Sequence, residues 1–135
     1  MKRRSTTTLN ARAFRVVAAV GLTLPDVAAA TRYDGSPILR IHGVFLAGLA
    51  THPSAAPDTL VVRSEIDDRE LLLADAPDTY YVTDYYRPYP IVLVRLAAID
   101  RDALRDLLSI SRRLAEAKTR RTSKRLKRES APVPN

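Results

Sequence analysis

The chain has 135 residues, of which 46% are hydrophobic and 27% charged, and its formal net charge is +7. A chain of this length and composition usually folds as one globular domain. With no cysteine and only two histidines, it lacks disulfides, thiolate chemistry and cysteine-based zinc sites, so we expect no catalytic residue, no metal and no cofactor.

The first half of the chain predicts a helix followed by a hairpin. Residues 9–22 repeat small and apolar side chains at helical spacing. In residues 24–31, Pro25 suits the first position of a short helical turn. In residues 36–50 the side chains follow a two-residue alternation before and after Gly43. This pattern favours two antiparallel strands joined by a turn at this glycine.

The second half predicts three further strands, one before and two after a helix, and then a last helix. We expect a strand over 59–66, a helix over 68–76, and strands over 79–83 and 91–99. Asp100 is a plausible cap for the last helix, whose stripe of leucine and alanine fades before the basic C-terminal residues.

This order of elements predicts an α+β fold, a two-layer sandwich of the order α-β-β-β-α-β-β-α, with an antiparallel sheet and its helices on one face. The other sheet face is then open. If Val92 and Val94 face the helices, the two-residue period of a strand turns Arg95 to the open face, and it places Arg40 and Arg63 outward in the same way. We expect the three arginines to gather on one surface.

These three arginines have two interpretations. Their guanidinium groups could hold phosphates or a carboxylate through forked hydrogen bonds. Alternatively, they pair with Glu65, Asp67 or Asp84 and make an open sheet face soluble.

Five of the six tyrosines lie in the segment "YYVTDYYRPYP", residues 80–90. Exposed rings can stack on unpaired bases, whereas buried rings would pack against the sheet edge. The two prolines favour a rigid loop that presents Tyr85 and Tyr89 outward. We therefore include Tyr85, Tyr86, Arg87 and Tyr89 in a candidate binding surface.

The positive charge is concentrated at the two ends of the chain. Residues 1–15 carry five basic and no acidic side chains, and residues 118–135 carry seven basic and one acidic, whereas residues 16–117 carry ten basic and fourteen acidic. We expect a basic N-terminal tail over 1–10, one domain over 11–117 and a basic, disordered C-terminal tail over 118–135. The candidate phosphate-binding residues of the second tail are Lys118, Arg120, Arg121, Lys124, Arg125, Lys127 and Arg128.

The N-terminus combines basic and apolar residues, but Arg12 and Arg15 interrupt the apolar part and no clean cleavage site follows. No apolar run is long enough to span a bilayer. We expect no membrane partner and a cytoplasmic location.

Four segments together resemble the MmcQ/YjbR family of small bacterial proteins. They read "LPDV", "YDGSPILRIHGVFLA", "LVVRSEIDDRELLLADAPDTYYVTDYY" and "YPIVLVRLAAIDRDALRDLL", and the resemblance covers roughly residues 14–117. It implies a fold like that of secretion chaperones and a DNA-binding role through a double-wing arrangement, with no established catalytic residues. The positions that fit the family pattern are Tyr33, Pro37, Gly43, Phe45, Arg63, Pro77, Tyr86, Pro90 and Arg95.

The chain departs from that pattern at two positions. Members often have histidine where this chain has Tyr85, and glycine where it has Pro88. A role that depended on that imidazole would not carry over.

Two functions follow. The leading hypothesis is a non-enzymatic protein that associates with DNA or RNA, largely electrostatically, through its basic tails and the arginine and tyrosine surface. The alternative is a module that binds a protein or a small ligand on the open sheet face, with no direct role in nucleic-acid binding.

Overall fold

The computed structural model describes the backbone of residues 6–130 and the side chains of residues 12–121. Three helices and six strands follow one another along this part of the chain. They are α1 (Thr6–Gly21), β1 (Val27–Thr31), β2 (Pro37–Ile41), β3 (Val44–Leu49), β4 (Thr59–Arg63), α2 (Ile66–Asp75), β5 (Tyr80–Tyr81), β6 (Ile91–Arg95) and α3 (Arg101–Ser130).

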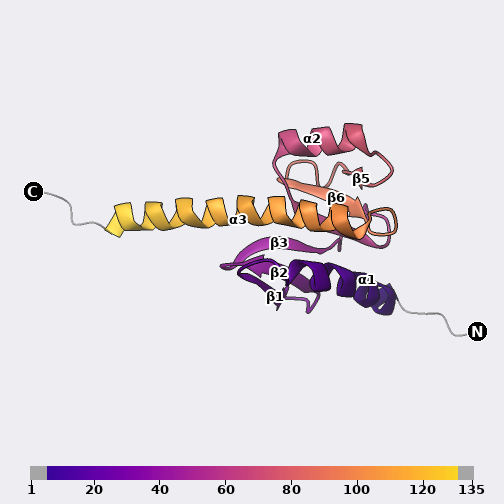
Figure 1. The fold of residues 1–135 in the computed structure, drawn as a ribbon, viewed down its shortest axis with the longest axis horizontal. Coiled ribbons are helices and arrows are strands. Elements are labelled where there is room, and N and C mark those ends of the chain that lie inside the picture. The colour runs from indigo at the N-terminus through magenta and orange to yellow at the C-terminus, as the bar shows by residue number, and fades with distance from the viewer. Residues whose placement is uncertain (1–5, 131–135) are drawn as a thin grey trace, which may run out of the picture.

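The six strands form one antiparallel sheet in the order β1-β2-β3-β4-β6-β5. Apolar side chains of all three helices join the core on the same face of this sheet. Figure 1 shows α1 and α3 over the β2 and β3 side, and α2 set apart near β5 and β6. The predicted α+β class, the antiparallel sheet and the placement of the helices on one face are confirmed.

β1 differs from the prediction, since residues 27–31 form an edge strand and not a helical turn. Each residue from Val27 to Thr31 pairs with a residue of β2. The three alanines of this segment favour a helix by propensity, but tertiary pairing routinely overrides propensity in so short a segment. The sheet therefore has one strand more than the sequence predicted.

The turn between β2 and β3 lies where the sequence placed it. His42 and Gly43 form a two-residue connection, and both have positive φ, 49° and 78°. Positive φ at both positions is typical of the turn whose twist matches that of a hairpin. His42 is therefore a turn residue.

The helices at the two ends extend into the segments that we expected to be tails. α1 begins at Thr6, within the expected N-terminal tail. α3 starts as predicted, with the Asp100 carboxylate accepting a hydrogen bond from the Ala103 amide at 2.7 Å, but it continues past residue 117 to Ser130. Residues 1–5 and 131–135 of the expected tails lie outside the described residues.

The core has two parts, one on each face of the sheet. The larger part lies between the sheet and the helices and includes Val17, Leu39, Leu60, Val94 and Leu108. The smaller part lies on the outer face, where Val61, Tyr86, Ile91 and Leu93 are buried together. The outer face is therefore not bare, because something other than a helix covers its centre.

Candidate binding site on the outer face of the sheet

Arg40, Arg63 and Arg95 lie on the outer face, as the alternation predicted, but they do not gather. Arg63 is the partner of Ile91 at one end of the β4–β6 pair, and Arg95 is the partner of Thr59 at the other end. Four residues of strand separate them, about 13 Å at 3.3 Å per residue. The expectation of one shared arginine surface is therefore wrong, because it used only the face of each residue and not its register.

Arg40 also stands apart from Arg63. It is the partner of Phe45 in β3. Its main chain therefore lies two strands from that of Arg63, about 10 Å away. Within the described residues no carboxylate forms an ion pair with any of the three arginines, so the predicted pairing with Glu65, Asp67 or Asp84 is absent there.

Two loops cover the centre of the outer face, residues 50–58 and residues 82–90. The Tyr86 hydroxyl accepts a hydrogen bond from the His52 amide at 3.2 Å, and the Ser54 and Thr83 hydroxyls lie 2.9 Å apart. Tyr81, at the edge of the sheet, accepts a hydrogen bond from the Ala56 amide at 2.9 Å through its hydroxyl. The two loops thus hold each other in place over the sheet.

Rings from both loops pack together in one stack. The His52 imidazole lies parallel to the Tyr85 ring, with centroids 3.5 Å apart and 9° between the planes. The Tyr86 ring meets Tyr85 edge to face, with centroids 5.0 Å apart. Tyr86 is buried and packs against the sheet, whereas Tyr85 and Tyr89 are 49% and 52% exposed. Both interpretations of the tyrosine segment therefore apply, each to different rings.

The exposed tyrosines border a cavity of about 400 Å³, which we call the tyrosine cleft. It is lined by Val61, Arg63, Tyr85, Tyr86, Tyr89, Pro90 and Ile91. Its floor is apolar and its wall is aromatic. One guanidinium group lies at its edge. Cavities of this size, mostly apolar with a few polar groups, are typical of ligand sites.

Arg63 supplies the charge of the cleft. Its Nε donates a hydrogen bond to the Phe45 carbonyl at 2.7 Å, which holds the side chain while its two terminal nitrogens form no hydrogen bond in the described structure. Burial lowers the pKa of Arg63 from its ordinary value, but a guanidinium remains charged at neutral pH. Its fork is therefore fixed and free to receive an anion.

Arg69 holds the loop that carries the exposed tyrosines, and the sequence analysis did not identify it. This arginine of α2 is only 2% exposed, and its Nη1 donates to the carbonyls of Tyr89 at 3.1 Å and Ile91 at 3.2 Å. The available signal was its position, because Arg69, Leu72 and Leu73 lie on one face of the helix.

The remaining predicted site residues of the fold lie outside the cleft. Arg87 is exposed, with its Nε 3.8 Å from the Asp84 carboxylate. Arg95 places its guanidinium 4.1 Å from the centre of the Tyr81 ring, beyond the far end of the loops. Only Arg63, Tyr85, Tyr86 and Tyr89 of the predicted surface are brought together.

The basic C-terminal residues lie on the part of α3 that projects past the sheet (Figure 1). The Ser111 hydroxyl still donates to the Leu46 carbonyl of β3 at 3.3 Å, and Arg121 follows ten residues later, about 15 Å along the helix. Lys118, Arg120 and Arg121 are exposed. Lys124, Arg125, Lys127 and Arg128 continue the helix, and their side chains lie outside the described residues.

A serine and a histidine approach each other beside the cleft, which the sequence analysis did not expect. His52 Nδ1 lies 2.8 Å from the Ser54 hydroxyl, but the same nitrogen accepts the Ser54 amide at 3.1 Å. No carboxylate pairs with His52 among residues 12–121, so the third member of a hydrolytic triad is missing there. The pair fastens the loop.

The described part of the chain contains no group of three or more histidine, aspartate or glutamate residues arranged to hold a metal ion. None of its helices combines the length and the apolar character that crossing a membrane requires.

No family model, no curated protein and no solved structure matches the chain. The resemblance to the MmcQ/YjbR family therefore stays a hypothesis.

Proposed function

We propose that this protein is a non-enzymatic, cytoplasmic member of the MmcQ/YjbR family that associates with nucleic acid and prefers unpaired bases. In this proposal the tyrosine cleft receives a base and a phosphate, and the basic part of α3 adds electrostatic attraction. The observation that supports it most is the combination of two exposed tyrosine rings with an unpaired, fixed guanidinium at one cavity.

The aromatic part of the cleft suits stacking. Bases stack on tyrosine rings whatever their sequence, because every base has a π face. Tyr85 is already stacked on its other side by His52, so its ring is held in one orientation before a base arrives. A ring fixed in advance loses less conformational entropy on binding.

The charge distribution favours a single strand over a duplex. A protein that binds duplex DNA usually presents a basic stripe on its fold, but residues 16–117 carry more acidic than basic side chains. A cleft of about 400 Å³ receives a flipped or unpaired base and not a stacked pair. The basic residues of α3 supply attraction that is independent of sequence and weakens with salt.

A second candidate function rests on the volume of the same cleft. About 400 Å³ lies within the range of small-ligand sites, and its chemistry suits a planar ring that carries an anionic group. Such a ligand would bind without a contribution from α3.

Binding of labelled single-stranded and duplex oligonucleotides, measured by fluorescence anisotropy over a range of salt, tests the proposal. We expect the single strand to bind more tightly, and we expect a mononucleotide to bind far more weakly than the oligonucleotide. A mononucleotide that binds equally well would support the small-ligand alternative, and a preference for duplex would contradict the role of the cleft.

A further inference from the structure

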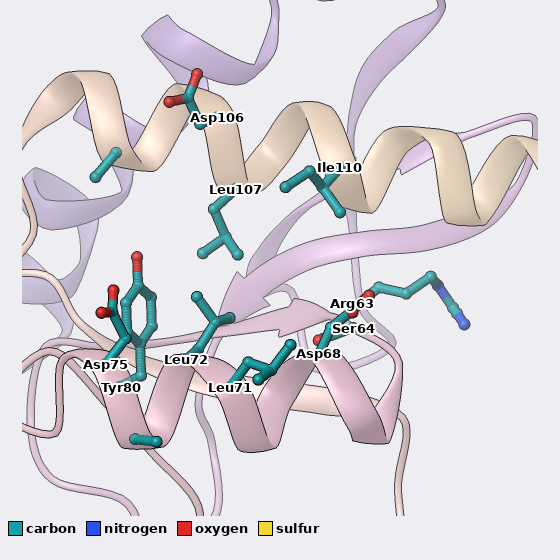
Figure 2. A pocket seen from close by; sticks show the side chains of 12 residues that line it. Arg63, Ser64, Asp68, Leu71, Leu72, Asp75, Tyr80, Asp106, Leu107 and Ile110 are labelled. Atoms are coloured by element: carbon teal, nitrogen blue, oxygen red, sulfur yellow. The ribbon is translucent and has the colours of Figure 1, made fainter.

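A second cavity lies on the helix side of the sheet, opposite the tyrosine cleft. It is a groove of about 790 Å³ between α2 and α3. Figure 2 shows the two helices as its walls, with the Tyr80 ring at one end. α1 and α3 pack against each other, so this groove is the place where the helical layer is interrupted. We call it the helix groove.

The groove is lined by apolar side chains that face one another across it. Leu107 and Ile110 extend from α3 toward Leu71 and Leu72 of α2 (Figure 2). Leu71 is 69% exposed and Ile110 47% exposed, although the same helices pack other apolar residues in or against the core. Large apolar side chains left exposed together on facing walls are typical of a binding surface.

Carboxylates stand along the α2 wall of the groove and at its rim on α3. Asp68 and Asp75 lie on α2, seven residues and therefore about two turns apart. Asp106 lies on α3, with its carboxylate on the side of that helix away from α2 (Figure 2). None of the three forms an ion pair with another described residue. Arg63 also borders the groove, but its guanidinium points away from it (Figure 2) toward the Phe45 carbonyl.

The hydroxyl of Tyr80 lies close to these carboxylates. Burial raises the pKa of Tyr80, and the nearby carboxylates of Asp100, Asp75 and Asp106 raise it further. The end of the groove at Tyr80 is thus negative. A positively charged group that entered the groove would meet carboxylates that form no ion pair within the described residues.

We propose that the helix groove binds a short amphipathic helix of another protein, with its apolar face between α2 and α3 and its basic side chains against Asp68, Asp75 and Asp106. A helix laid in an apolar groove is a common recognition mode, and its anchors repeat at three and four residues. Lysine or arginine two turns apart on such a helix would match the spacing of Asp68 and Asp75.

The shape of the groove favours a helix as the occupant. α2 has ten residues, about 15 Å in length, which matches three turns of a helix lying beside it. An inserted helix would also complete the helical layer between α2 and α3. The basic end of this chain is a poorer occupant, because Leu126 is the only large apolar residue between residues 118 and 130.

A pair of designed peptides provides the probes. The first, about 18 residues long, has leucines on one helical face and lysines on the other, and the second has glutamates in place of the lysines. Full-length protein carries a net charge of +7, which repels the lysine peptide in general. We expect the lysine peptide to bind in the micromolar range nonetheless, because the groove is locally acidic.

Two sets of variants locate the binding. We expect the triple variant Asp68→Asn, Asp75→Asn, Asp106→Asn to bind the lysine peptide about tenfold more weakly. A second triple variant removes the same number of negative charges from exposed positions outside the groove, and its affinity for the lysine peptide should stay within about twofold of the wild type. It consists of Asp67→Asn, Asp78→Asn and Asp102→Asn.

The apolar walls are tested in the same way. We expect the double variant Leu71→Ser, Ile110→Ser to bind the lysine peptide about tenfold or more weakly than the wild type. Val16→Ser with Leu22→Ser removes two similarly exposed apolar side chains, one in α1 and one directly after its end, and should leave binding unchanged. Circular dichroism of every variant checks that its fold is intact. The glutamate peptide should be insensitive to the groove variants, since its attraction is to the basic ends.

Three outcomes would overturn the proposal. The first is an equal loss of binding in the groove and control triple variants, which would indicate general charge attraction. The second is undiminished binding when Leu71 and Ile110 are serine. The third is a dimer, seen by sedimentation without peptide, that the groove variants convert to a monomer, because the groove would then be filled by a second copy.

Discussion

The buried guanidinium of Arg69 donates a hydrogen bond from Nη1 to the main-chain carbonyl of Tyr89, at 3.1 Å. This bond joins α2, which forms one wall of the helix groove, to the loop that carries the tyrosine cleft on the other face of the sheet. Arg69 is therefore a structural link between the two candidate binding surfaces, although it is accessible from neither.

We predict that Arg69→Ala lowers the free energy of unfolding by about 2–4 kcal/mol, because it leaves the carbonyls of Tyr89 and Ile91 without their charged donor. Urea denaturation measures the loss, and hydrogen exchange should show faster exchange in residues 83–91. Arg105→Ala, an exposed position of α3, is the control and should change stability by less than about 0.5 kcal/mol. Equal stability of the two variants would show that the Arg69 bonds contribute little.

The hydroxyl of Tyr81 fastens the loop of residues 50–58 and can be removed without changing the ring. Tyr81→Phe deprives the Ala56 amide and the buried Thr59 hydroxyl of their partner, so we expect it to cost about 1–2 kcal/mol. Thermal and urea denaturation measure this cost. Tyr33→Phe removes a hydroxyl from a fully exposed ring and should have no effect. A Tyr81→Phe variant as stable as the wild type would indicate that water replaces the lost hydroxyl.

Alkaline pH should destabilise the protein through Tyr80. Its pKa is raised by burial first and by Asp100, Asp75 and Asp106 next, so the folded state holds the phenol proton more tightly than the unfolded state. The corresponding stability is complete below the ordinary tyrosine pKa of about 10 and is lost as the pH rises through the folded pKa. Tyr80→Phe should remove this part of the pH dependence in denaturation experiments.

The pKa of Tyr80 also depends on the carboxylates at the end of the helix groove. NMR titration of labelled tyrosine should show that Asp75→Asn with Asp106→Asn lowers this pKa only part of the way toward 10, because burial is the larger cause. An unchanged pKa in that double variant would mean that the two carboxylates exert no field on the hydroxyl.

The exposed rings of the tyrosine cleft should carry the binding of unpaired bases. We expect Tyr85→Ala and Tyr89→Ala each to weaken binding of a single-stranded oligonucleotide by about tenfold, since stacking is worth about 1–3 kcal/mol per base. The slope of affinity against salt should stay the same, because no charge is removed. Tyr33→Ala, with a fully exposed ring outside the cleft, is the matched control, and comparable losses in all three variants would argue against a specific site.

The turn residue His42 offers a test of the hairpin. Its φ of 49° is a conformation that asparagine adopts more readily, so His42→Asn should raise stability by about 0.5 kcal/mol. Gly43→Ala should lower it by about 1 kcal/mol through backbone strain alone, because a Cβ at Gly43 would meet no atom within 4 Å. Urea midpoints compare the two. A destabilising His42→Asn would show that the 3.9 Å contact of His42 with Asp26 matters more than the turn.

Features that depend on neighbours along the chain were predictable from the sequence. The alternation of β2, β4 and β6 predicted which side chains share a face of the sheet, Gly43 predicted the turn of the hairpin, and Asp100 predicted the start of α3. Each of these follows from the backbone period or from a local hydrogen bond within a few residues. The concentration of tyrosines in residues 80–90 likewise indicated the candidate binding surface.

Features that depend on distant segments were decided only by the tertiary structure. The period of a strand assigned Arg40, Arg63 and Arg95 to one face, but the register between strands separated them, and register is set by pairing and not by composition. His52 reaches Tyr85 across 33 residues of sequence, and Arg69 reaches Tyr89 across 20. No local pattern encodes such contacts, because they arise when packing brings separate segments together. The same packing leaves α2 apart from α3 and so creates the helix groove.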